Sequence, residues 1–177
     1  METRRADVHP DTRVLNRFVT AALERQKRHY QGTWLSALIL LPPNSMELPT
    51  ALIEDTVLEP VDKLILLLLM SRARRDDGVA IMPTHAELAR SVNVVARQTV
   101  ACSLAILRCR RWMTVCRTSW RRARLTGSAY ALHASPLPIE DTIYLDPRYR
   151  DFLEELADQH RVRTRNMAND VLDQFSE

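Results

Sequence analysis

The sequence is poor in glycine and has no long apolar run. Only three of its 177 residues are glycine, while 46% are apolar and 27% are charged. This composition is typical of a folded, mostly helical protein rather than a disordered one. The longest apolar run, Leu64–Met70, is far shorter than the roughly 20 residues of a membrane-spanning helix. We therefore expect a single core with appendages and no membrane segment.

Cysteine is also scarce. Cys102, Cys109 and Cys116 are spaced by seven residues, whereas zinc ligands usually pair about two to four residues apart. The odd number of cysteines and the lack of a signal peptide at the N-terminus indicate reduced thiols and a cytoplasmic location. We expect neither a metal nor a cofactor.

Catalytic motifs are missing as well. The five histidines are scattered along the chain, and no glycine-rich phosphate loop is present, so we predict that the chain is not an enzyme. Asp76-Asp77 precedes Gly78 and could suggest a metal site, but two acidic residues before a glycine more often form a turn.

Positive charge is concentrated in one stretch of the chain. The net charge of +3 hides a segment, 72–125, with twelve arginines and no lysine against three acidic residues. Residues 135–177 hold five arginines against ten acidic residues. A basic segment can be a solvated face, but it is also a common route to nucleic-acid or membrane binding.

Several elements can be predicted in the first 82 residues. Apolar residues recur at helical spacing over 11–30, and an apolar stretch at 34–41 is either a helix or a strand. Residues 46–53 contain Pro49 and predict a short extended piece. A nearly apolar core helix is expected from about Pro60 to Arg74, followed by a turn and a short strand at 79–82.

The next segment predicts two helices joined by a tight turn. Thr84 and Glu87 have the spacing of a capping box, which predicts the start of a short helix. Asn93 can supply the turn because asparagine tolerates the left-handed conformation. A second, longer helix is expected from about Ala96 to Arg110, where no serine is present to cap it.

A hairpin and two further helices complete the prediction. Residues 112–117 and 128–133 alternate in hydropathy, and the segment 118–127 between them is rich in arginine. We predict a β-hairpin with an arginine-rich tip and call this hairpin the wing. Helices are then expected from Asp146-Pro147 onward and over 164–175.

This order of elements is the layout of a winged helix-turn-helix. The predicted fold is mainly α, with extra helices at both ends: an N-terminal extension (1–45), the winged domain (46–135) and a C-terminal extension (136–177). In this layout the second helix of the pair enters the major groove of double-stranded DNA and the wing contacts the backbone. We therefore predict a DNA-binding protein.

Individual DNA contacts can be predicted from residue chemistry. For base readout we predict Arg97, Gln98 and Ala101, since arginine can bond guanine and glutamine adenine through paired contacts; the alternative is that they are ordinary exposed helix residues. Predicted contacts to the DNA backbone are Thr84, Thr99, Arg108, Arg117, Trp120, Arg121, Arg122 and Arg124.

Two of these predictions have structural alternatives. Trp120 either packs under the wing or stacks on sugar and base, and packing is the more common role. Arg108, Arg110 and Arg111 close the predicted recognition helix, where the helix dipole alone favours cations. At least one of the three is expected to be structural.

The sequence also resembles a known group of proteins. The segments 38–42, 48–49, 76–79 with Pro83-Thr84, 104–112 and 127–133 are similar to the helix-turn-helix replication proteins of bacterial pathogenicity islands and integrative conjugative elements. This resemblance implies a role on mobile-element DNA, in replication, maintenance or the control of transfer genes. It implies no catalytic residue.

The main alternative is a winged helix that acts as an adaptor for proteins in a replication or partition complex, since fold alone does not decide function. An adaptor has little need for four arginines on an exposed hairpin, which favours DNA. The amphipathic helices at 11–30 and 164–175 lead us to predict a homodimer.

Overall fold

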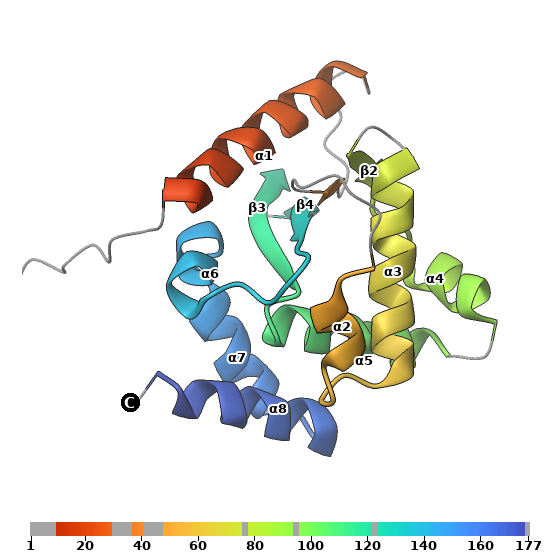
Figure 1. The fold of residues 1–177 in the computed structure, drawn as a ribbon, viewed down its shortest axis with the longest axis vertical. Helices are drawn as coiled ribbons and strands as arrows, with labels where there is room; N and C mark the ends of the chain where they lie inside the picture. The colour runs from red at the N-terminus through yellow and green to blue at the C-terminus, as the bar shows by residue number, and fades with distance from the viewer. Residues whose placement is uncertain are drawn as a thin grey trace, which may run out of the picture.

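The computed structural model describes residues 10–29, 37–40, 48–75, 78–93, 96–121 and 124–175. Most of the elements are helices (Figure 1), which confirms the prediction of a mainly helical chain. In chain order they are α1 (Pro10–His29), β1 (Ala37–Leu40), α2 (Thr50–Glu54), α3 (Pro60–Arg75), β2 (Val79–Ile81), α4 (His85–Val92), α5 (Arg97–Cys109), β3 (Met113–Arg121), β4 (Arg124–Leu132), α6 (Ile139–Leu145), α7 (Tyr149–Ala157) and α8 (Val162–Asp173).

The strands form one four-stranded sheet in the order β2-β1-β4-β3. The hairpin β3–β4 and the pair β1–β2 are antiparallel, whereas β1 runs parallel to β4. The apolar stretch that allowed either a helix or a strand is therefore a strand at Ala37–Leu40. It lies between β2 and the hairpin, so β2 does not pair with β3 or β4 directly.

The two faces of the sheet are covered by different helices. Leu132 and, with partial exposure, Tyr130 face the main core, which includes residues of α3, α5, α7 and α8. The alternating positions Ala129 and Ala131 face α1 and form a second, smaller apolar cluster with it. In Figure 1, α1 and α3 accordingly lie on opposite sides of the hairpin.

Both predicted extensions contribute to the main core. Leu38 of β1, in the predicted N-terminal extension, is fully buried in it. Tyr149 and Leu153 of α7 and Val171 of α8, in the predicted C-terminal extension, are fully buried in the same cluster. The boundaries at 45 and 136 therefore do not separate independent cores.

The extended piece expected around Pro49 is a helix in the structure. Residues Thr50–Glu54 form α2, and the amides of Leu52 and Ile53 both donate to the carbonyl oxygen of Pro49. Proline is compatible with the start of a helix because its fixed φ suits the first turn and its missing N–H has no partner there anyway. The predicted extended piece is therefore wrong over residues 50–53. Met46 and Glu47 lie outside the described residues.

Two further elements differ from the predictions. Helix α6 (Ile139–Leu145) was not predicted; it begins after Pro138, whose carbonyl oxygen accepts from the amide and the hydroxyl of Thr142. The arginine-rich segment 118–127 is mostly strand rather than a long tip, because the hairpin ladder continues as far as Arg121↔Arg124.

Within the described ranges, no single helix is long and apolar enough to cross a membrane. Helices α4 and α5 pass that test only when they are taken together across the sharp bend between them.

Candidate nucleic-acid interface

Helix α4 begins with the predicted capping box. The side-chain oxygen of Thr84 accepts from the amide of Glu87, and the Glu87 carboxylate accepts from the amide of Thr84 at 2.7 Å. The Thr84 hydroxyl also donates to this carboxylate. The bonds from Thr84, first the backbone one and then the hydroxyl, lower the pKa of Glu87. The start of α4 is thus held by its own side chains.

Asn93 ends α4 and begins the connection to α5. Its φ of 57° lies in the left-handed region, as predicted, and its amide donates to the carbonyl oxygens of Ala89 and Arg90. The chain changes direction by 101° across a break of no more than four residues. Helix-turn-helix pairs have a similar angle, about 90–120°, and a similarly short turn.

The N-terminal end of α5 is open to solvent. Ala96 provides no side-chain cap, and Arg97 and Gln98 are exposed. Neither side chain bonds to any other residue that the structure describes. The first intrahelical bonds are those of Thr99 and Val100 to the carbonyl oxygen of Ala96, so the amides of Arg97 and Gln98 precede the helical ladder and point out of the helix.

The exposed face of α5 begins at these two residues and continues with small ones. Ala101 and Ala105 are half-buried and lie on the same side of the helix as Arg97 and Gln98, whereas Val100 and Leu107 face the core. Short side chains allow another surface to approach the helix backbone closely.

At its C-terminal end the same face is already occupied. Arg108 donates to Asp146 through Nε at 3.0 Å and through Nη2 at 2.6 Å. Its guanidinium also lies 3.9 Å from the centre of the Phe152 ring. The Asp146 side chain is 4% exposed and that of Arg108 is 19% exposed. Burial raises the pKa of Asp146, although Arg108 partly opposes the rise.

Arg108 therefore has a structural role in this fold, and we do not retain it as a DNA contact. The sequence argument placed Arg108 at the end of the recognition helix and expected at least one of Arg108, Arg110 and Arg111 to be structural. It could not detect that residues 146 and 152, far along the chain, come back to cover this end of α5.

Further bonds hold the end of α5 in place. Arg111 adopts a left-handed φ of 62° and donates from Nε to the carbonyl oxygen of Leu137. Trp112 is fully buried, and its indole donates to Asp55 at 3.1 Å. The Tyr149 hydroxyl donates to the carbonyl oxygen of Cys109.

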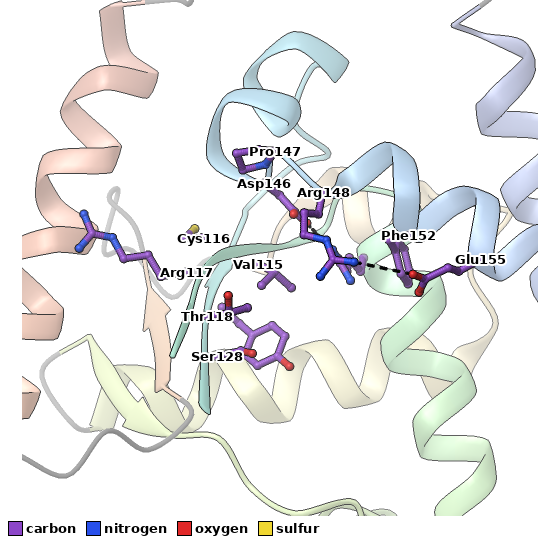
Figure 2. A pocket seen from close by; sticks show the side chains of 12 residues that line it. Val115, Cys116, Arg117, Thr118, Ser128, Asp146, Pro147, Arg148, Phe152 and Glu155 are labelled. Carbon is purple, nitrogen blue, oxygen red and sulfur yellow. Dashed lines mark hydrogen bonds and ion pairs between the residues drawn. The ribbon is translucent and has the colours of Figure 1, made fainter. Parts of the chain in front are cut away.

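A concave surface lies between α5, the wing and α7. It consists of two hollows of about 360 and 410 Å³, which share Arg108, Val115, Tyr130 and Phe152 in their linings. Figure 2 shows the hollow nearer the wing, with Arg148 of the α6–α7 connection and Glu155 of α7 forming an ion pair beside it. The C-terminal segment thus lines the space next to the exposed face of α5.

The wing residues are only partly described. Arg117 is exposed, and its guanidinium donates from Nη2 to the Thr20 hydroxyl of α1 at 3.0 Å. Figure 2 shows it pointing toward α1. The backbones of Trp120, Arg121 and Arg124 lie in β3 and β4, but nothing is described of their side chains, and Arg122 lies outside the described residues. The predicted roles of these four residues stay predictions.

The structure gives no indication of metal chemistry among the residues that it describes. They contain no group of three or more histidine, cysteine or acidic side chains placed to hold a metal ion. Cys102, Cys109 and Cys116 are free thiols, and burial raises the pKa of Cys109 to about 12. Asp76 and Asp77 are not among the described residues.

In comparisons with models of protein families, with curated proteins and with solved structures, the chain has no significant match. The resemblance to replication proteins of mobile elements therefore stays a prediction from the sequence.

Proposed function

We propose that this chain is a winged helix-turn-helix protein that binds double-stranded DNA. In the proposed complex, the N-terminal half of α5 enters the major groove and α4 braces it against the backbone. The hairpin β3–β4 is the proposed wing. The role on the DNA of a mobile element, in replication, maintenance or transcriptional regulation, rests on the sequence resemblance alone.

One observation carries this proposal: α5 begins with two exposed polar side chains on a rigidly supported helix end. Arg97 and Gln98 have no partner among the described residues, whereas Val100, Leu104 and Leu107 of the same helix are buried in the main core and hold it in place. A rigid support with unpaired side chains suits a partner that supplies the missing bonds, because little conformational entropy is lost on binding.

The chemistry of this helix end fits DNA. The amides of Arg97 and Gln98, which precede the helical ladder, and the positive end of the helix dipole would attract a phosphate group. Arginine can donate two bonds to guanine, and glutamine can pair with adenine. The small side chains of Ala101 and Ala105 would let the helix lie deep in the groove.

The test is a titration of the full chain with duplex DNA across a range of salt concentrations, followed by selection of preferred sequences from a random pool. We expect binding at low salt that weakens steeply as salt rises. Arg97→Ala and Gln98→Ala should each reduce preference for the selected sequence by about 1–3 kcal/mol, which is roughly fivefold to 150-fold.

Arg165→Ala is the matched control, because Arg165 is an exposed residue of α8. It should leave sequence preference unchanged. Absence of duplex binding at low salt, with the wild type folded, would contradict the proposal and favour the adaptor for replication or partition proteins.

A further inference from the structure

Helix α1 is firmly docked on the side of the sheet opposite α5. Val19 and Ala22 are fully buried and Leu23 is 3% exposed, and they pack against Ala129 and Ala131 of β4. The rest of the helix surface is therefore held in a fixed orientation relative to the wing.

One flank of α1 is rich in arginine. Residues three, four, seven or eight positions apart share a side of a helix, and by this rule Arg13, Arg17 and Arg28 lie on the same flank as Thr20. All three arginines are exposed. Thr20 marks the border with β3, because its hydroxyl accepts from Arg117. Three guanidinium groups thus lie along this flank of α1, and that of Arg117 lies beside the flank at Thr20.

This flank has a positive excess. Glu24 lies among the arginines, and its carbonyl oxygen accepts from Nε of Arg28. Exposed Glu140 lies one turn before Tyr144, whose hydroxyl accepts from Asn16 of α1 at 3.5 Å. Against these two carboxylates stand the four arginines, and none of them forms an ion pair with any residue that the structure describes.

We propose that Arg13, Arg17, Arg28 and Arg117 form a second DNA surface, which binds the sugar-phosphate backbone outside the stretch read by α5. This inference rests on the proposed DNA-binding function. Arginine forks match the geometry of phosphate oxygens, and their attachment to a docked helix means that the surface is formed before DNA arrives. The surface supplies affinity without sequence preference.

The position of α1 sets the length of DNA that is needed. Since α1 and α5 cover opposite faces of the sheet, a duplex that only fills the α5 site cannot reach both surfaces. A longer duplex can do so if it bends around the wing, at a cost in elastic energy of the DNA that the added phosphate contacts offset. Binding to the longer duplex should therefore depend more steeply on salt than binding to the shorter one.

The experiment compares the full chain with the triple variant Arg13→Ala/Arg17→Ala/Arg28→Ala. A control triple variant, Arg150→Ala/Arg161→Ala/Arg165→Ala, removes the same charge from exposed positions in or beside α7 and α8, outside the flank. Dissociation constants are measured by fluorescence anisotropy over a salt series, on a short and a long duplex that carry the same selected sequence. Circular dichroism checks that each variant is folded, and a triple glutamine variant replaces the alanine one if it is not.

We expect the wild type and the control to have a steeper logarithmic salt slope on the long duplex, by about 0.9 for each additional phosphate contact. The flank variant should lose this difference and keep its sequence preference. Equal slopes for the flank variant and the control on the long duplex would overturn the inference, as would equal wild-type slopes on the two duplexes. Failure of the proposed function is distinct from these results, because the wild type would then bind neither duplex.

Discussion

The two ends of α5 differ although they belong to one helix. At the N-terminal end, Arg97 and Gln98 are exposed and unpaired among the described residues. At the C-terminal end, Arg108 is held by Asp146 and Phe152, and Trp112 just beyond the helix is fully buried. One end of α5 therefore contributes to stability, and the other is available for a partner. Substitutions at the two ends should therefore affect different measurements.

The largest effect on stability is expected at Trp112. Trp112→Ala removes a fully buried side chain and leaves a cavity, so we expect a loss of about 3–5 kcal/mol in the free energy of unfolding. It also removes the indole N–H that donates to the Asp55 carboxylate. Urea unfolding monitored by circular dichroism measures the loss. Gln98→Ala, at the other end of α5, should change stability by no more than about 0.5 kcal/mol. A similar loss for both variants would contradict the difference in role between the two ends.

The ion pair between Arg108 and Asp146 provides a second test of the difference between the two ends of α5. Arg108→Ala leaves Asp146 buried without its cation, and we expect a loss of about 2–3 kcal/mol, less than the full penalty for a buried pair because Arg108 is partly exposed. The affinity of the folded variant for DNA should stay close to that of the wild type. A tenfold weaker affinity with unchanged stability would instead assign Arg108 to the end that binds.

Lower pH should reduce the free energy of unfolding through the buried side chain of His133. His133 is buried, with 5% of its surface exposed, and bonds to Thr114; burial lowers its pKa from 6.5 to about 3. Because the unfolded chain takes up this proton at higher pH than the folded one, the stability from a neutral His133 is complete above pH 6.5 and decreases as the pH falls toward 3. The expected slope is about 1.4 kcal/mol per pH unit within that window.

Unfolding by urea at a series of pH values measures this slope. Carboxylates with lowered pKa values, such as Asp55, add to the loss in acid, so the quantity to compare is the difference between wild type and His133→Asn. If the two pH profiles are parallel, His133 does not make this contribution.

The smallest of these effects is expected at the start of α4. Thr84→Ala removes the side-chain cap and should cost about 1 kcal/mol, which thermal unfolding can detect. Arg90→Ala, at an exposed position on the same helix, is the control. Because α4 supports the open end of α5, Thr84→Ala should also weaken sequence preference slightly. An unchanged stability would mean that the capping box does not hold this end of the pair.

The sequence allowed prediction of the features that depend on neighbouring residues. The capping box joins residues three positions apart, and the left-handed turn depends on Asn93 itself. The exposure of Arg97 and Gln98 followed from the helical period of α5. Each of these features depends on residues close together in the sequence, so periodicity and side-chain chemistry were enough to predict it.

The features that the sequence could not predict join distant parts of the chain. Arg108 and Asp146 are 38 positions apart, and Arg117 and Thr20 are 97 positions apart. Helical period places Arg108 on an exposed face but carries no information on which later segment covers it. The short helices α2 and α6 were missed for a different reason: both begin after a proline, which allows either the end or the start of a helix.

The parallel pairing of β1 with β4 has a consequence for synthesis on the ribosome. Leu38 pairs with Tyr130, so β1 can pair with β2 early but must wait for β4 until most of the polypeptide has been translated. Contacts between such distant positions slow folding, and unpaired edges expose the nascent chain to aggregation. The hairpin can form locally, but the sheet is completed only when the first strand inserts beside the last.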